Sequence, residues 1–169
     1  TPPTAKLMKG AHVFASYAKQ AISDYAGNPL IEALPPILSE EVAVQLISNF
    51  PCPVDPEELT LDRSTRIHCI DRLRTVVQPL MVHLDLESVF SLLIRRGYVG
   101  RNPTSPATVR HLHSLSGAQR YHDGFKSTAE TFSLVGLSGI GKSTALEAIL
   151  SLYPQTIRHE RYEGKQFVH

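Results

Sequence analysis

One eight-residue motif limits what this chain can fold into more than any other feature. Residues Gly136 to Ser143 read Gly-Leu-Ser-Gly-Ile-Gly-Lys-Ser, which fits the pattern Gly, four residues, Gly-Lys-Ser/Thr. The short apolar run before the motif, 131–135, is typical of a buried parallel strand. After the motif, apolar residues recur at helical spacing, so 142–152 is predicted to form an amphipathic helix. A strand, a glycine loop and a helix in this order predict a binding site for nucleotide phosphates.

Each residue type in the motif has a physical role in such a site. Glycines let the backbone take positive φ and turn its N–H groups toward an anion, and the helix N-terminus adds unpaired N–H donors and a positive dipole end. We expect Lys142 to reach the β- and γ-phosphates, the Ser143 hydroxyl to bind Mg²⁺ and the Thr144 N–H to face the α-phosphate. The structural alternative is a glycine-rich turn without a ligand. The predicted phosphate-binding residues are Gly136, Leu137, Ser138, Gly139, Ile140, Gly141, Lys142, Ser143 and Thr144.

Composition is that of an ordinary globular protein and narrows the function little. The 169 residues are 42% hydrophobic and 20% charged, with a net charge of +1, which neither supports nor excludes DNA as a partner. No run approaches the roughly 20 apolar residues of a membrane span. We therefore expect a cytoplasmic chain with no membrane partner. Cys52 and Cys69 are too few and too far apart for a metal quartet or a disulfide framework, and are expected to be reduced thiols.

The first 126 residues are predicted to be mostly helical. In the third predicted helix the core-facing residues are Ile67, Ile70, Leu73 and Val77, and in the fourth they are Leu86, Val89, Phe90, Leu93 and Ile94. Ser39 is expected to cap the second helix and Gly97 to follow the fourth. The predicted helices span 12–27, 39–50, 64–78 and 86–96, with an extended segment at 30–36, a turn at 55–58, a weaker helix at 108–119, a linker at 117–128, a second strand within 155–162 and a turn at 163–165.

Three weaker groupings have both a functional and a structural interpretation. The histidines 111, 113 and 122 suggest a metal site, but the stretch is polar and offers no fourth ligand at a recognised spacing, so surface histidines are favoured. The aromatic residues 14, 17 and 25 are favoured as core over a base-stacking platform. The arginines 63, 66, 72, 74, 95, 96 and 101 are interleaved with acidic residues, which favours a solvated mixed-charge surface over a phosphate-binding face.

Four separated segments resemble the TnsC/TniB family of AAA+ ATPases, which regulate DNA transposition in bacterial mobile elements. The most specific is Tyr25 to Pro36, which reads Tyr-Ala-Gly-Asn-Pro-Leu-Ile-Glu-Ala-Leu-Pro-Pro. The second, 96–103, reads Arg-Gly-Tyr-Val-Gly-Arg-Asn-Pro. The third is the glycine motif, 136–144, and the fourth runs from Tyr153 to Phe167. The glycine motif alone is shared with many NTPases, so the first segment carries most of the resemblance.

The resemblance implies a function and a set of partners. Such proteins bind ATP with Mg²⁺, form homo-oligomeric rings or filaments on DNA, and connect target-selection proteins to the transposase. It implies an α/β fold in which a mostly helical region, 1–126, precedes the strand–P-loop–helix–strand beginning of an AAA+ domain, 127–169. The acidic strand motif, the polar sensor and the intersubunit arginine of that domain would lie beyond His169, so the chain is expected to be an N-terminal fragment without a complete catalytic site and without ATPase turnover.

Two other classes of function remain open from the sequence. The first is a P-loop kinase or signalling NTPase with an unrelated helical prefix. The second is a binding module that makes protein contacts and turns over no nucleotide. The residues that would separate these possibilities from a transposition regulator are expected downstream of His169.

Overall fold

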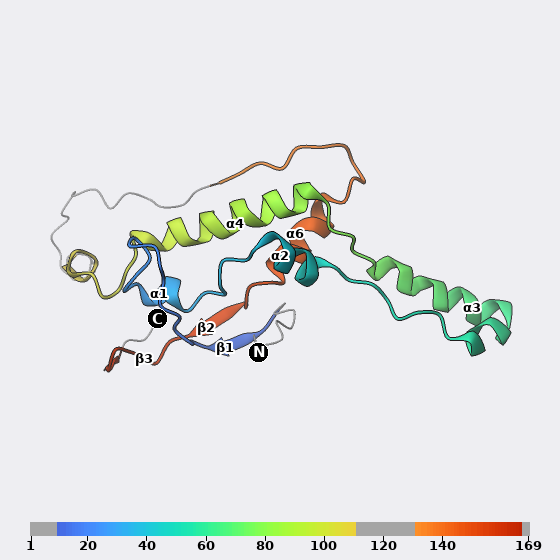
Figure 1. Ribbon diagram of the computed structural model, residues 1–169, viewed down its shortest axis with the longest axis horizontal. Coiled ribbons are helices and arrows are strands. Elements are labelled where there is room, and N and C mark those ends of the chain that lie inside the picture. The colour runs from blue at the N-terminus through green and yellow to red at the C-terminus, as the bar shows by residue number, and fades with distance from the viewer. Residues whose placement is uncertain (1–9, 111–130, 167–169) are drawn as a thin grey trace, which may run out of the picture.

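Helix α4 runs along a body made from both ends of the chain, and a helical arm projects from that body (Figure 1). The structure is a computed structural model that describes residues 10–110 and 131–166. The described elements, in order, are β1 (His12–Phe14), α1 (Pro29–Glu32), α2 (Glu40–Ile47), the 3₁₀-helix η1 (Pro56–Thr60), α3 (Arg63–Ile70), the 3₁₀-helix η2 (Asp71–Thr75), α4 (Met81–Val99), α6 (Lys142–Leu150), β2 (Thr156–Arg158), β3 (Arg161–Tyr162) and β4 (Lys165–Gln166).

The apolar core lies where three helices meet. Helix α6 contributes Ile149, which is fully buried, and Ala145 one turn earlier. These side chains pack with residues of α2 and α4 and with the segment that follows α6, namely Ala43, Ile47, Leu84, Leu86 and Leu152. The prediction of an amphipathic helix directly after the glycine motif is confirmed, with α6 ending at Leu150.

A two-stranded parallel ladder joins the two ends of the described chain. His12 of β1 faces Thr156 of β2, and Phe14 faces Arg158. The predicted helix over 12–27 is therefore wrong. Its apolar residues have helical spacing, but their backbone groups bond to distant partners instead: the N–H of Ala15 donates to the carbonyl of Arg158, and that of Ala18 to the carbonyl of Glu32.

The segment after this extended stretch forms the short buried helix α1, where an extended segment over 30–36 was predicted. Asn28 caps it, because its Oδ1 accepts from the N–H of Leu30 while its Nδ2 donates to the carbonyl of Tyr98 at 2.8 Å. Asn28 is 1% exposed and Ile31 is equally buried. The polar cap is thus also the contact that joins α1 to the end of α4.

Two further helices begin close to their predicted start and end early. The Ser39 side chain caps α2 as predicted, accepting from the N–H of Val42. Helix α3 starts at Arg63, one residue before the predicted start, but gives way to η2 after Ile70. Most of the predicted turn at 55–58 belongs instead to η1, residues 56–60, which Asp55 caps. The predicted core face of α3 is wrong, because neither α3 nor η2 buries any side chain.

Helix α4 is longer than predicted and buries a different face. It starts at Met81 rather than after Asp85, and Gly97 lies inside it while Gly100 forms its C-cap. The predicted face over 86–94 is only partly correct: Leu86 is buried, whereas Val89 is 43% exposed. The buried residues are Leu84, Leu86, Glu87, Ser91 and Arg95, so much of the buried face is polar.

Arg95 fills the polar part of that face. It is 2% exposed, and it donates to the Ser91 hydroxyl at 2.5 Å and to the Pro35 carbonyl at 2.6 Å. Burial raises the pKa of the nearby Glu87 carboxyl, while a hydrogen bond from Tyr153 and the charge of Arg95 act in the opposite direction. These polar contacts connect α4 to the segment after α1 and to Tyr153, which lies three residues after the end of α6.

A second polar cluster holds the β3–β4 hairpin on the N-terminal segment. Glu32 accepts from the Tyr162 hydroxyl at 2.9 Å and from the N–H of Gly27 at 2.9 Å. Burial, together with the hydrogen bond to Glu32, raises the pKa of Tyr162 to about 12. The predicted turn after Tyr162 is confirmed: Glu163 and Gly164 both have positive φ, and β3 and β4 pair antiparallel on either side of it.

Part of the predicted organisation lies outside the described residues. Residues 106–110 are helical, but most of the predicted helix 108–119, the linker 117–128 and the domain boundary after 126 lie in 111–130. Within 10–110 and 131–166, no helix is both long enough and apolar enough to cross a membrane.

We predict that Arg95→Ala lowers the free energy of unfolding by about 3 kcal/mol or more, because it leaves the Pro35 carbonyl and the Glu87 carboxylate buried without their cation. Urea denaturation measures this. Arg101→Ala, on an exposed position, is the control and should change the stability by less than about 0.5 kcal/mol. Equal effects of the two substitutions would contradict the importance of the buried cluster.

Candidate nucleotide-phosphate site

The glycine motif forms a turn that leads into the N-terminus of α6. Residues 131–137 run alongside α4 and residues 138–141 turn into the helix (Figure 1). Gly139 has φ +78° and Gly141 has φ +89°, the left-handed region that favours glycine. Gly141 is the N-cap of α6. The predicted helix directly after the motif is therefore observed.

The Lys142 side chain folds back over the loop. Its Nζ donates to the carbonyl of Gly136 at 2.8 Å and to the carbonyl of Leu137 at 2.7 Å. An ammonium group has three N–H donors, and within the described part of the chain the third has no partner. Two backbone carbonyls thus fix a positive charge at the mouth of the loop, with one donor free for an anion.

The first turn of α6 presents donors of its own. The opening N–H groups of a helix have no carbonyl partner within the helix, and Gly141 has no side chain with which to cap them. No acidic residue lies in this turn, so no carboxylate of the turn competes for them. Ser143 and Thr144 are exposed on the same turn, whereas Ala145 is buried in the core. The helix therefore points its positive end and two hydroxyls outward.

These features give the site a definite chemistry. The loop amides, the helix end and Lys142 suit a polyanion that carries charge on neighbouring oxygens, as the phosphates of a nucleotide do. Ser143 offers one hard oxygen ligand to a cation. Across the described residues, no group of three or more His, Cys, Asp or Glu side chains lies together as a metal site. Mg²⁺ at Ser143 would therefore take its other ligands from phosphate and water, which is its usual preference.

The strand expected before the loop is not formed. Residues 131–137 carry no strand pairing, and Val135 and Leu137 are 91% and 80% exposed. The segment is held by side chains instead: the rings of Phe132 and Phe90 meet edge to face with centroids 6.4 Å apart, and Leu134 packs on the core. A strand exists only through hydrogen bonds to a neighbouring strand, and none of the described strands lies beside this segment.

The other candidate residues that the sequence suggested do not lie at the glycine loop. His111, His113 and His122 lie outside the described residues. Tyr25 is buried, as a core residue should be, while Phe14 is 68% exposed beside Arg158. Of the arginines, Arg95 is buried on α4 whereas Arg63, Arg66 and Arg74 are exposed on the arm, so they do not form one basic face. Cys52 and Cys69 are free thiols.

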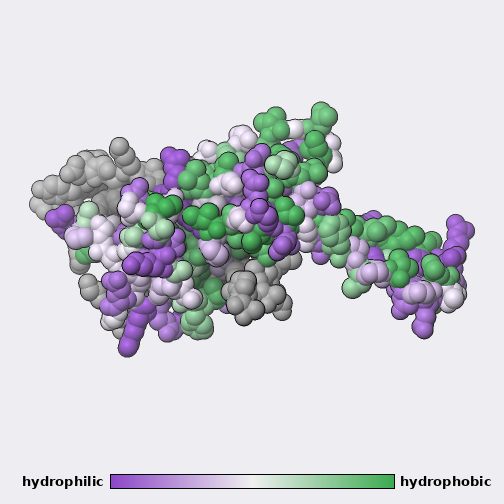
Figure 2. Space-filling view, viewed as in Figure 1, coloured by the Kyte–Doolittle hydropathy of each residue, from purple (hydrophilic) through white to green (hydrophobic). Residues whose placement is uncertain are grey.

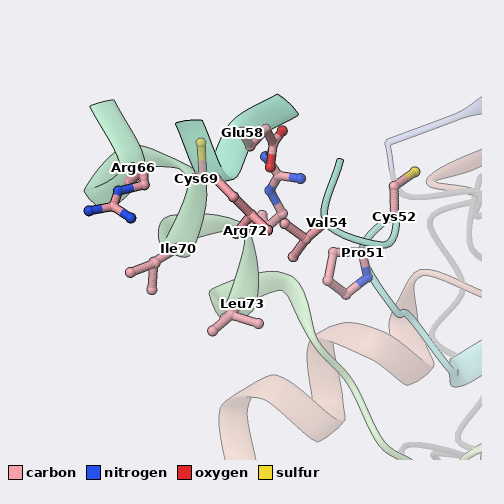
Figure 3. A pocket seen from close by; sticks show the side chains of 10 residues that line it. Pro51, Cys52, Val54, Glu58, Arg66, Cys69, Ile70, Arg72 and Leu73 are labelled. Carbon is pink, nitrogen blue, oxygen red and sulfur yellow. The ribbon is translucent and has the colours of Figure 1, made fainter. Parts of the chain in front are cut away.

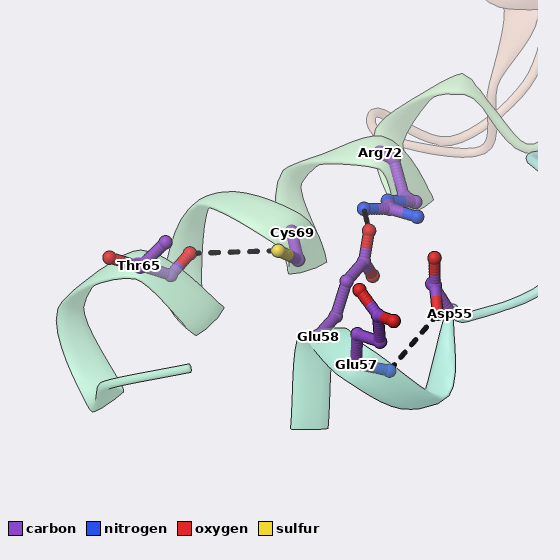
Figure 4. A network of polar contacts seen from close by, with 6 residues as sticks. All are labelled: Asp55, Glu57, Glu58, Thr65, Cys69 and Arg72. Atoms are coloured by element: carbon purple, nitrogen blue, oxygen red, sulfur yellow. Dashed lines mark hydrogen bonds and ion pairs between the residues drawn. The ribbon is translucent and has the colours of Figure 1, made fainter. Parts of the chain in front are cut away.

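An apolar hollow on the arm, which the sequence did not predict, is the second feature that a ligand would fit. Its volume is about 330 Å³, and it lies between the loop at Pro51–Val54 and the helices α3 and η2 (Figure 3). Its walls include Leu59, Ile70 and Leu73. The signal for it in the sequence is the apolar face of Ile67, Ile70 and Leu73, whose helical spacing predicts a core face and not a hollow. In Figure 4 an ion pair closes one side, where Arg72 donates to Glu58 at 2.6 Å.

We predict that Gly141→Ala destabilises the chain by about 1–2 kcal/mol, because a Cβ is strained at φ +89° although space is free around it. Gly136→Ala is the matched control, since its Cβ would meet Ile140 and Lys142 at ordinary contact distances. Thermal unfolding of both variants measures the difference. A Gly141→Ala protein as stable as the Gly136→Ala protein would argue against the left-handed loop.

The chain was compared with models of protein families and with curated proteins. No family model and no curated protein matches it.

Proposed function

We propose that residues 136–144 bind the phosphates of a nucleoside triphosphate together with Mg²⁺, and that the nucleotide is ATP. The observation that carries this proposal is the Lys142 ammonium, fixed over the loop by the carbonyls of Gly136 and Leu137. A lysine used only for solubility would extend into water, where its entropy is highest. Here it lies over a loop of left-handed glycines that ends in an uncapped helix N-terminus.

Each part of the loop would make a different contact with the bound nucleotide. The amides of the loop and of the first turn of α6 would donate to phosphate oxygens, and the third N–H of Lys142 would neutralise charge on the β- and γ-phosphates. Ser143 would ligate Mg²⁺, which bridges phosphate oxygens and keeps several waters. The choice of ATP over other triphosphates comes from the family resemblance, because the loop contacts phosphates and not the base.

We propose further that the chain belongs to an ATP-dependent regulator of DNA transposition of the TnsC/TniB kind. The support is the resemblance of four segments, and three of these contact one another. Asn28 of the first segment donates to the Tyr98 carbonyl of the second. Glu32 of the first accepts from Tyr162 of the fourth at 2.9 Å. Asn102 of the second donates to the carbonyl of Gly27 at 3.1 Å. The likeness thus falls on residues that form one structural unit around α1.

The first test is nucleotide binding by calorimetry. We predict that Lys142→Ala weakens Mg-ATP binding by at least about tenfold, because a fixed positive charge is lost from the loop. Lys19→Ala, at an exposed position away from the motif, is the matched control and should bind like the unaltered chain. Equal Mg-ATP affinity in all three proteins would refute the phosphate site. Equal affinity for GTP would remove only the assignment to ATP.

The second test concerns DNA. We predict that ATP promotes assembly of the protein on duplex DNA and that Lys142→Ala abolishes this assembly, as measured by electron microscopy and gel mobility shift. The physical reason is that only the nucleotide-bound loop would stabilise the assembling conformation. Assembly on DNA that is unchanged by Lys142→Ala, with nucleotide binding lost, would count against the transposition role while leaving the phosphate site intact.

A further inference from the structure

The arm, defined as η1, α3 and η2, exposes apolar side chains that the rest of the described chain covers only in part. None of the three elements buries a residue. Leu59, Ile67, Ile70 and Leu73 are between 57% and 65% exposed. Figure 2 shows the corresponding apolar surface along the projecting arm. Fixing the backbone of one residue costs about 1–2 kcal/mol of conformational entropy. Side chains that stay more than half exposed recover only part of this cost through apolar burial, so the arm lacks the burial that usually stabilises a helix.

The apolar residues of α3 are arranged for pairing with another helix. Ile67 and Ile70 are three residues apart and share one face. Arg66 directly precedes this pair. Asp71 directly follows it as the C-cap of α3, still with helical φ and ψ, so the two charges lie on opposite flanks of the face. In heptad terms the four residues occupy positions g, a, d and e. When two such helices pair in parallel, the residue at position g of one helix faces the residue at the following position e of the other. Arg66 of one copy would therefore lie opposite Asp71 of a second copy.

The two flanking charges are available for such a contact. In the described part of the chain the Arg66 guanidinium makes no hydrogen bond or ion pair, and it is exposed. Asp71 contacts Arg74 at 3.1 Å, but both side chains of that pair are highly exposed, so the pair is weak. Arg72, in contrast, is engaged by Glu58 on the inner side of the arm (Figure 4). In Figure 3, Ile70 and Leu73 project to the side of the helix away from Glu58.

We propose that two copies of this chain associate through α3 in parallel. Ile67 and Ile70 of each copy pack against the same residues of the other, and Arg66 of each faces Asp71 of the other. A second copy is the occupant that fits, because one copy supplies both the apolar pair and the two opposite charges in the spacing that a parallel partner requires. The interface is small, so the association is reversible and weaker than nanomolar. It needs no nucleotide and does not depend on the phosphate site.

The experiment is sedimentation velocity over a concentration series without nucleotide. The unaltered chain is expected to dimerise as its concentration rises to about 0.1 mM. Arg66→Asp alone and Asp71→Arg alone each place like charges across the interface and are expected to stay monomeric. An equimolar mixture of the two variants restores both opposite-charge pairs and is expected to dimerise. Both positions are exposed, so folding should be preserved, and circular dichroism checks this.

The apolar pair is tested separately. Ile70→Asp should weaken dimerisation by at least about tenfold. The control is Ile37→Asp, because Ile37 is similarly exposed, at 54%, but lies outside the arm. Lys142→Ala should dimerise like the unaltered chain. The proposal is overturned if the unaltered chain remains monomeric over the whole series, or if it dimerises while the mixture of charge variants does not.

Discussion

The one-sided burial of helix α6 is the constraint on which the candidate site depends. Ile149 has no exposure and Ala145 is almost as buried, so the helix cannot rotate or slide without opening the core. Because these residues fix one face, Ser143 and Thr144 at the first turn are exposed, whereas Lys142, three residues before Ala145 and on the same face, is half-buried at the end of the helix. The position of the glycine loop therefore follows from apolar packing several residues away from it.

The rest of the body is held by buried polar groups that bridge distant parts of the chain. Arg95 connects α4 to the Pro35 carbonyl, Asn28 connects α1 to the end of α4, and Glu32 connects α1 to Tyr162. A buried polar group that loses its partner is costly, so these contacts specify one arrangement more strictly than apolar packing alone. They also bring the segments 25–36, 96–103 and 153–167, which are separated in sequence, together around α1.

Sequence reasoning succeeded where the signal is local. The Ser39 cap, helix α6 after the glycine motif and the turn at Glu163–Gly164 all depend on residues within a few positions of one another. It failed at 12–27, where helical spacing of apolar residues was outweighed by pairing with a strand more than a hundred residues later. It also failed on α4, since the burial of Glu87 and Arg95 depends on partners from other segments. For α3 the pattern was correctly detected, but its apolar face is exposed rather than buried.

At the glycine motif, the sequence predicted which residues form the loop, and the geometry adds how Lys142 is held. The carbonyls of Gly136 and Leu137 orient the ammonium. In the proposed phosphate site this order would reduce the entropy lost when a nucleotide binds. The most direct measurement is a ¹⁵N–¹H NMR titration of the chain with Mg-ATP. Shifts confined to the amides of Gly136 to Thr144 and their neighbours are expected. The absence of shifts there at saturating Mg-ATP, or shifts centred on the arm instead, would contradict the account.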